Sequence, residues 1–316
     1  HRQPRSGHSV LLLEHHHRLG GLATWFKRKP HIIDVSLHGF PYGLVKTCKK
    51  YWNREIMNAI VQLKDIVFDN PQFSLRTTFD KEDFIAILDR KFQVDSSQVE
   101  RFLSRINKMN FYDDQAMTTR ELFEEFFPGR SDVHRLLMEP ITYANGSTLD
   151  DPAITYGIVF SNFMNRGVFT FEGGTDHLIK LMAAELEKNG VTICTRAKVD
   201  RIVTGNRKTR GVEVNNTFKK AGAVVSNSGI TNTVYQLSDV RQFSDEFLEK
   251  AAKIRVNNSS CQVYIGIKEE EQIEPIGDLL FTSLSPEFDS AELLDINTRS
   301  KTFSVYYPKT RPGHDR

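Results

Sequence analysis

Hydrophobic and polar positions in about the first 80 residues predict strands on both sides of a helix. The apolar run of residues 9–13 closes with Glu14, which predicts a buried strand of a parallel sheet. After a polar turn, loop and short strand, apolar residues one to four apart predict a helix over residues 41–65. Residues 73–79 alternate between apolar and polar, a pattern typical of a half-exposed strand.

Residues 80–166 are expected to be mostly helical. Amphipathic stretches repeat there, and most follow a residue whose side chain can accept a hydrogen bond from the first turn of a helix. The expected start residues are Asp80, Asp95, Thr118 or Thr119, Asp132 and Pro152. The helices are expected at residues 80–91, 96–110, 120–127, 133–143 and from 150 onward.

Short strands replace helices as the expected structure from residue 168 onward. A strand and the turn Gly173-Gly174 lead into one more helix, and Gly190 stands where a left-handed cap residue belongs. The strands are expected at residues 169–171, 191–195, 199–204, 210–214, 221–226, 261–265 and 303–307. This order predicts an α/β fold in which a helical block interrupts a sheet domain.

Composition favours a globular protein with a sizeable core. Of the 316 residues, 39% are hydrophobic and 26% are charged, and the mean hydropathy is −0.40. The formal net charge is only +2, which argues against a nucleic-acid-binding protein because phosphate binding needs a concentrated basic surface. No apolar run approaches the roughly 20 residues that span a bilayer.

The cysteines and histidines argue against a metal site. Cys48, Cys194 and Cys261 are far apart and form no Cys-x-x-Cys pair, so we expect core residues in a reducing, cytoplasmic environment. His15, His16 and His17 are consecutive, and adjacent side chains on an extended strand point to opposite faces. Such a run rarely ligates one ion, and no metal is expected.

Glu14 and the glycine pair that follows it are the first candidates for chemistry. An acid at the end of a second parallel strand can accept both ribose hydroxyls of an adenine dinucleotide. Paired glycines such as Gly20-Gly21 let the backbone approach a pyrophosphate closely. An acid that merely ends a strand and a plain tight turn are the alternatives. The GxGxxG turn expected about 20 residues upstream would precede residue 1.

The stretch from Phe169 to Ser228 carries a longer pattern. Gly173-Gly174 opens an amphipathic helix, Gly190-Val191 starts a strand, and Ala223–Asn227 reads as a buried strand with a polar end. Together with Glu14…Gly20-Gly21 and the segment 33–38, this stretch resembles the flavin-dependent phytoene desaturase and carotenoid isomerase family. That family lies within the wider amine-oxidase-like flavoproteins, and the resemblance covers most of the chain.

The resemblance implies a Rossmann-type FAD-binding domain with an inserted α+β substrate domain. The FAD-binding domain would comprise residues 1–40 and 166–235, and the substrate domain residues 41–165 and 236–316. Both the upstream GxGxxG turn and the family's C-terminal glycine-rich flavin segment are missing from the sequence. The chain is therefore expected to be the middle of a longer protein of about 500 residues.

The resemblance also assigns cofactor-binding residues for FAD. Glu14 would bind the ribose, and Gly20 and Gly21 would lie against the pyrophosphate. Val199 would pair its backbone with the adenine edge, while Ser226 and Asn227 would close the dinucleotide groove. The family often has arginine after the glycine pair. Leu22 stands there in this sequence, and Arg18 and Lys27 are the alternatives for that phosphate contact.

The implied reaction is a flavin hydride transfer at an apolar polyene or isoprenoid, giving desaturation, isomerisation or saturation. An amine oxidase of the same superfamily and a non-catalytic fragment without competent FAD binding are the alternatives. No catalytic acid or base is assigned, although His38 could face the flavin.

The expected partner is an apolar small molecule, with no nucleic acid, and the oligomeric state is left open. Basic residues on the predicted helix 41–65 offer a peripheral contact with an anionic membrane, and a solvated helix face is the alternative. These residues are Lys46, Lys49, Lys50 and Arg54, together with Trp52.

Overall fold

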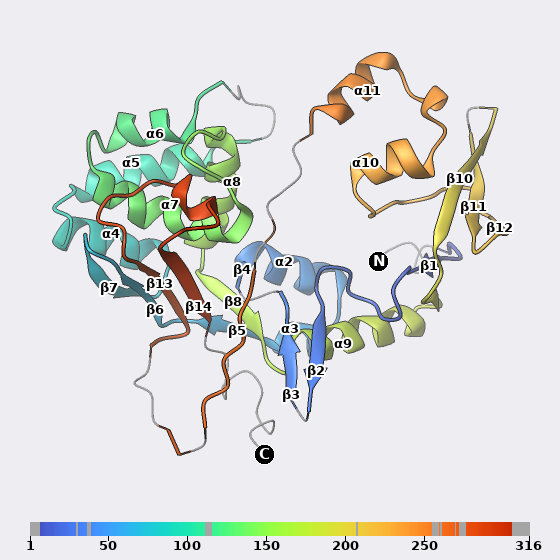
Figure 1. Cartoon of the computed structure of the whole chain (residues 1–316), viewed down its shortest axis with the longest axis horizontal. Coiled ribbons are helices and arrows are strands. Elements are labelled where there is room, and N and C mark those ends of the chain that lie inside the picture. Colours follow the sequence, from blue (N-terminus) through green and yellow to red (C-terminus); the bar gives the residue numbers. More distant parts are fainter. Residues whose placement is uncertain are drawn as a thin grey trace. The chain divides into compact units, whose positions relative to one another are not determined.

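The computed structural model forms two compact units, each built from two separate stretches of chain (Figure 1). The first unit comprises residues 1–24 and 179–256, and the second residues 25–178 and 257–316. The structure describes residues 7–29, 31–36, 39–110, 116–206, 208–254, 259, 261–268, 270–271 and 276–304. Residues 25–40 thus pack with the second unit, while the assignment of FAD-binding and substrate domains stays a prediction.

The first unit contains a parallel strand pair and a three-stranded antiparallel sheet. β1 (Leu11–Leu13) pairs in parallel with β9 (Thr192–Cys194), as the sequence predicts for β1. β10 (Val199–Gly205), β11 (Lys208–Val214) and β12 (Thr217–Lys220) form the sheet in that order. The helical segments are α10 (Ile230–Asn232), a π turn (Thr233–Leu237), a 3-10 turn (Val240–Gln242) and α11 (Asp245–Ala252). Helix α9 (Gly174–Lys188) begins in the second unit and continues in the first.

The second unit contains a mixed four-stranded sheet, a three-stranded sheet and a hairpin. The four-stranded sheet has the order β14-β13-β6-β7, in which β13 pairs in parallel with β6. Its strands are β6 (Ile66–Asp69), β7 (Ser74–Thr77), β13 (Leu279–Ser283) and β14 (Ser300–Ser304). The three-stranded sheet has β8 (Val168–Phe171) between β4 (Phe40–Pro41) and β5 (Ile60–Leu63). β2 (Trp25–Arg28) and β3 (His31–Asp34) form the hairpin.

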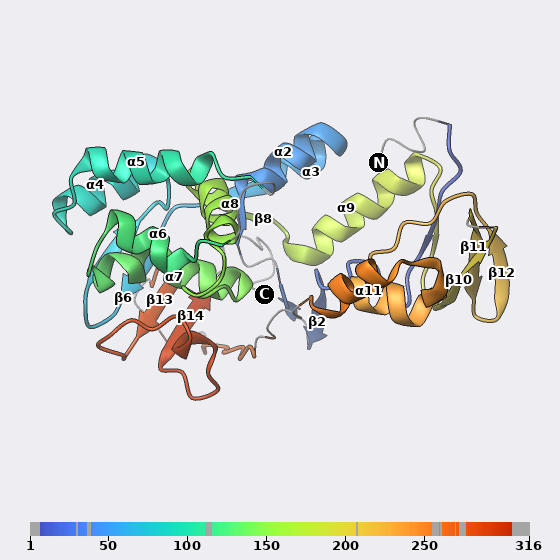
Figure 2. The same cartoon turned by 90° about the horizontal axis from the view of Figure 1, so that it is seen from above.

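Helices gather beside the four-stranded sheet around an aromatic core (Figures 1 and 2). They are α4 (Lys81–Arg90), α5 (Ser96–Asn107), α6 (Thr119–Phe126), α7 (Ser131–Asn145) and α8 (Ala153–Met164), and a 3-10 turn (Glu292–Leu294) precedes β14. Helices α2 (Tyr42–Tyr51) and α3 (Arg54–Asn58) contact β4 and β5 of the three-stranded sheet instead. Phe102 on α5 is fully buried, and its ring centroid lies 5.1 Å from that of Phe127 and 5.9 Å from that of Phe123. No helix in the described part of the chain is long and apolar enough to cross a bilayer.

Local side-chain chemistry explains where most of these helices begin. The Asp80 carboxylate accepts from the Asp83 N–H at 3.0 Å, and Asp95 caps α5 in the same way. Thr118 and Glu121 form a reciprocal capping box at α6. The prediction that Asp132 is the residue at which α7 begins is wrong. Arg130 occupies the N-cap of α7, and Asp132 lies in the first turn, where its carboxylate accepts from the Arg130 guanidinium.

Three expected elements differ in the structure. Residues 60–63 form strand β5 instead of continuing the helix predicted for 41–65, because these residues pair with β8. Residues 221–226 form no strand, and Val225 is 88% exposed. Residues 261–265 also lack strand structure, and Cys261 is exposed instead of buried in a core.

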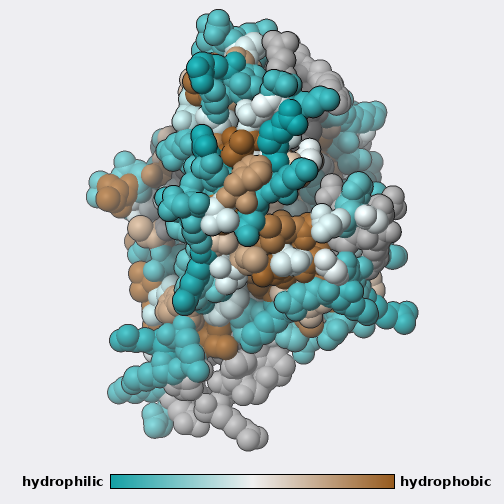
Figure 3. Space-filling view, turned by 90° about the vertical axis from the view of Figure 1, so that its right-hand side faces the viewer, coloured by the Kyte–Doolittle hydropathy of each residue, from teal (hydrophilic) through white to brown (hydrophobic). Residues whose placement is uncertain are grey.

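Strand β1 is less buried than predicted. Leu11 is 41% exposed, and Leu12 and Leu13 are half-buried. A parallel strand becomes fully buried only when neighbouring strands and covering helices enclose it. β1 has one partner strand, β9, among the described residues. Figure 3 shows that patches of hydrophobic residues reach an otherwise mostly hydrophilic face of the molecule.

Candidate functional site

The small core of the first unit brings together three segments that the resemblance assigns to FAD. Ala197, Val212 and Val214 form its buried centre. Leu13, which precedes Glu14, packs against this centre, as do Val199 and Val224. The end of β1, the start of β10 and the segment before Ser226 therefore meet around one hydrophobic cluster.

Glu14 is held by its own backbone at the carboxyl end of β1. Its N–H donates to the Cys194 carbonyl oxygen at 2.9 Å, and its carbonyl oxygen accepts from the Ala197 N–H at 2.9 Å. The half-buried side chain accepts from the His16 N–H at 2.7 Å through Oε1. No residue that the structure describes bonds the second oxygen, Oε2. One carboxylate oxygen is therefore fixed, and the other is available to a hydroxyl.

Gly20 and Gly21 form a tight turn with left-handed backbone. The Ala23 N–H donates to the Gly20 carbonyl oxygen at 3.0 Å, and φ is +122° at Gly20 and +59° at Gly21. A Cβ on Gly20 would lie 2.2 Å from the Ala23 carbonyl oxygen, so the turn itself requires glycine there. A Cβ on Gly21 would meet no described atom within 4 Å. The backbone at Gly21 is thus open to a ligand, which fits a pyrophosphate.

Val199 lies at the first position of β10, where the ladder with β11 is irregular. Val199 pairs with Val214, and the register then shifts by one residue between Val199 and Arg201. Such a bulge leaves one residue outside the regular backbone pairing. The predicted pairing of Val199 with an adenine edge stays a prediction.

Ser226 and Asn227 lie in irregular, exposed chain instead of at the end of a buried strand. The Ser226 hydroxyl oxygen lies 3.0 Å from that of Ser228 and 2.7 Å from that of Thr233. Thr233 also donates to the Gly229 carbonyl oxygen at 2.7 Å. The three hydroxyls thus form one polar cluster at the edge of the first unit, and the predicted role of Ser226 and Asn227 in closing the groove stays untested.

Asp34 is a structural residue that the sequence reasoning did not single out. Its Oδ1 accepts from the Thr175 N–H at 3.0 Å, and the Thr175 hydroxyl donates to the Ser36 carbonyl oxygen at 3.2 Å. Tyr264 donates its phenolic hydrogen to the Asp34 carbonyl oxygen at 2.9 Å. Two segments of the family-like pattern, 141 residues apart, are therefore joined directly at the start of α9. Leu37 and His38 lie outside the described residues.

A buried polar cluster lies in the second unit along α7. Arg135 donates to the Gln72 side chain at 2.9 Å and to the carbonyl oxygens of Ser285 and Glu287 at 2.8 and 3.2 Å. Its Nε lies 3.9 Å from Oε2 of Glu139, and both side chains are at most 2% exposed. Neither Glu139 carboxylate oxygen has a hydrogen-bond partner among the described residues. Burial raises the pKa of Glu139 to about 7, although the charge of Arg135 acts in the opposite direction.

The basic residues expected to meet a membrane lie on α2 and at the start of α3. Lys46, Lys49, Lys50 and Arg54 are exposed, whereas Trp52 is half-buried. The Lys46 ammonium lies 5.5 Å from the ring centroid of Tyr42, and that of Lys50 lies 4.9 Å from the ring of Tyr51. These contacts fit a solvated helix face equally well, and membrane contact stays a prediction. Among the described residues, no group of three potential metal ligands occurs.

Comparisons with known proteins place this geometry in a family. Residues 5–279 match the model of flavin-containing amine oxidoreductases. The 4,4'-diaponeurosporene oxygenase of Staphylococcus aureus is 29% identical over 138 residues, which are 43% of this chain and 27% of that protein. The chain thus aligns with about a quarter of the length of this curated relative.

Two solved structures share the fold. An oxidoreductase from Methanosarcina mazei superposes with a TM-score of 0.63 at 19% identity, covering 80% of this chain and 60% of that one. A CLA-producing fatty acid isomerase from P. acnes gives a TM-score of 0.52 at 15% identity, covering 76% and 57%. The predicted α/β flavoprotein fold and the FAD cofactor are confirmed at the level of the family. The chain belongs to the flavin-containing amine oxidoreductases.

Proposed function

We propose that this chain is part of an FAD-dependent oxidoreductase that acts on an apolar polyene or isoprenoid. The family membership supports flavin-dependent oxidoreduction. The alignment with a protein named 4,4'-diaponeurosporene oxygenase supports a carotenoid-like substrate. The observation that supports the cofactor assignment is the packing of Leu13, Val199 and Val224 around one core cluster, because Leu13 directly precedes Glu14 and Val224 lies two residues before Ser226.

The residues of the first unit would hold the adenosine half of FAD. The free Oε2 of Glu14 would accept ribose hydroxyls, while the bond from the His16 N–H keeps the carboxylate in place. The open backbone at Gly21 would lie against the pyrophosphate. The backbone of Val199 would face the adenine, and Ser226 and Asn227 would close the groove. When bound, FAD supplies the hydride transfer, and the protein supplies position and a dry cavity.

Replacing Glu14 by glutamine is expected to weaken FAD binding by about 10- to 100-fold, because hydrogen bonds to a charged acceptor contribute about 1.5–3 kcal/mol. Titration of the purified chain with FAD, followed by flavin fluorescence, measures this change. Glu213→Gln is the matched control, since Glu213 belongs to the same unit and pairs with Arg201 on the exposed face of the β10–β11 sheet. Equal losses in both variants, or no FAD uptake by the unaltered chain, would contradict the assignment.

Substrate class is tested by reduction of the bound flavin without oxygen. A polyene hydrocarbon is expected to bleach the absorbance near 450 nm, and a primary amine is expected to leave it unchanged. The family name makes amine oxidation the second candidate. Bleaching by the amine alone would replace the polyene proposal with that candidate.

A further inference from the structure

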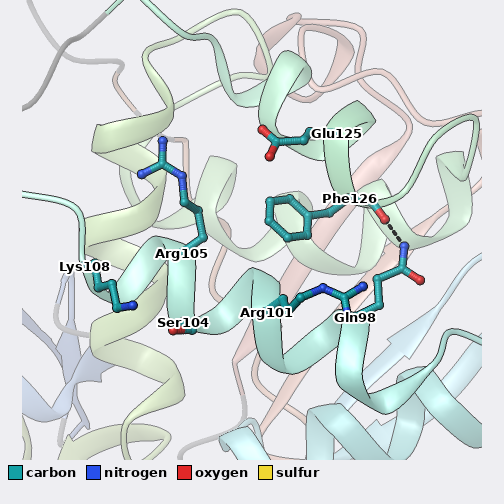
Figure 4. A pocket seen from close by; sticks show the side chains of 7 residues that line it. All are labelled: Gln98, Arg101, Ser104, Arg105, Lys108, Glu125 and Phe126. Carbon is teal, nitrogen blue, oxygen red and sulfur yellow. Dashed lines mark hydrogen bonds between the residues drawn. The ribbon is translucent and has the colours of Figure 1, made fainter.

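A groove of about 540 Å³ lies in the second unit between α5 and α6, and none of its lining residues is assigned to FAD (Figure 4). Gln98, Arg101, Arg105 and Lys108 line it from α5. Their spacing of three, four and three residues places them on one face of the helix. The other face is fixed in the core by Val99, Phe102, Leu103 and Ile106, all of which are buried. The packing of α5 therefore turns a row of polar and basic side chains toward the groove.

The groove carries an excess of positive charge. Arg101, Arg105 and Lys108 are exposed cations, and Glu125 is the one acid among the lining residues. Arg101 donates to the Ser97 hydroxyl oxygen at 3.1 Å. The side chains of Arg105 and Lys108 make no hydrogen bond or ion pair with any residue in the described ranges. Like charges three or four residues apart repel, and an anionic ligand beside the row would relieve that repulsion.

The helix dipole accounts for only part of this charge. Basic residues are favoured in the last turn of a helix, and α5 ends at Asn107, which explains Arg105 and Lys108 taken by themselves. Arg101 lies nearly two turns before that end, so the dipole does not explain it. The continuation of the basic row along the groove points to a ligand.

The wall opposite the basic row is fixed in position. The Gln98 amide donates to the Phe126 carbonyl oxygen, and the Phe126 ring centroid lies 5.5 Å from that of Phe102 in the core. Figure 4 shows the half-buried Phe126 ring between Arg105 and Gln98, with Glu125 above it. The groove thus combines a fixed aromatic wall with three exposed cations.

We propose that this groove binds a phosphate group. Two guanidinium groups can each donate in a fork to phosphate oxygens, and Lys108 adds a compact charge. The phosphate could be free or belong to a lipid headgroup, and both sources present the same oxyanion. The carboxylate of Glu125 would repel a second anionic group of the ligand on the same side of the Phe126 ring.

The test compares two variants that each remove two positive charges from the purified chain. Arg105→Gln/Lys108→Gln changes the groove. Lys81→Gln/Arg90→Gln is the control, because both residues are exposed on the neighbouring helix α4 and neither lines the groove. Circular dichroism checks that both variants fold. Binding is measured with inorganic phosphate by amide NMR shifts, and with phosphatidylglycerol–phosphatidylcholine vesicles by sedimentation.

A tenfold or greater loss of binding in the groove variant, with less than a twofold change in the control, is expected. Loss seen with inorganic phosphate identifies a free phosphate, and loss seen only with vesicles identifies a lipid headgroup. Two results would overturn the proposal. One is that the unaltered chain binds neither probe, and the other is that both variants lose binding equally, which would show general charge attraction.

Discussion

Replacing Arg135 by methionine is expected to lower the free energy of unfolding of the second unit by about 3–5 kcal/mol at pH 8. The reason is that its guanidinium is the positive charge beside the buried Glu139 carboxylate. The same group bonds the carbonyl oxygens of Ser285 and Glu287, which tie the β13–β14 connection to α7. Urea unfolding followed by tryptophan fluorescence reports on this unit alone, because both tryptophans, Trp25 and Trp52, belong to it.

The control for this variant is Arg120→Met. Arg120 pairs with Asp150 at 2.9 Å, but both side chains are more than half exposed. Exposed pairs contribute about 0–1 kcal/mol, so the control is expected to unfold close to the wild type. The double variant Arg135→Met/Glu139→Leu should recover part of the loss, since it removes the buried charge as well. An Arg135 variant as stable as the control would show that Glu139 needs no counter-charge.

Glu139→Gln is expected to change the pH dependence of stability by about 3 kcal/mol, at 1.36 kcal/mol per pKa unit. Burial raises the pKa of Glu139 from its ordinary 4.5 to about 7. The folded protein therefore keeps a proton that the unfolded chain releases. The contribution of this group to stability is full below pH 4.5, and it is lost as the pH rises to about 7. Glutamine cannot ionise, so the variant gains stability relative to wild type across that window.

The measurement is the difference in urea unfolding free energy between variant and wild type at pH 4.5 and pH 8. Other acids cancel in this difference. Glu121, for instance, has its pKa lowered by hydrogen bonds from the backbone and side chain of Thr118, so its contribution to stability has the opposite pH dependence. This contribution is the same in variant and wild type, and it therefore drops out of the difference. A difference that stays constant with pH would mean that Glu139 is already ionised at pH 4.5. Its pair with Arg135 would then be charged throughout.

Local chemistry made the helical block predictable. Asp80 and Asp95 are predictable as caps because their side chains satisfy backbone N–H groups within three residues. The sequence offers Thr118 or Thr119 for the next helix, and the structure shows Thr118 as its cap. Such contacts depend on neighbouring residues only. Gly190 is also confirmed as a left-handed residue, with φ of +80° two residues after the end of α9 at Lys188.

Long-range pairing made other elements unpredictable. Ile60 and Val61 continue a helical spacing in the sequence, yet they pair with Phe171 and Thr170 of β8. Local periodicity contains no information about that partner strand. Strand β6 was missed in the same way, since the pairing of Ile66 with Leu279 joins residues more than 200 positions apart.

The candidate site also combines features that a short stretch of sequence reveals with contacts that only the fold reveals. Glu14 and Gly20-Gly21 are candidates from the sequence because strand, acid and glycine turn follow one another within a short segment, and their role in FAD binding stays a prediction. The bond between Asp34 and Thr175 carried no local signal, because an aspartate at the end of a short strand is common. Only the fold shows that its carboxylate meets the first turn of α9.

The parallel pairing of Leu13 with Cys194 also constrains how the protein folds during synthesis. The ribosome must add the whole intervening stretch before β1 can meet β9. At about 5–20 residues per second, this delay is roughly 10–40 s. For that time Leu11–Leu13 lack their partner strand β9, and in the second unit β6 likewise waits for β13. Each unit is completed only after a stretch that belongs to the other unit has been made. The strand edges that β9 and β13 cover therefore stay accessible to chaperones until those two strands emerge.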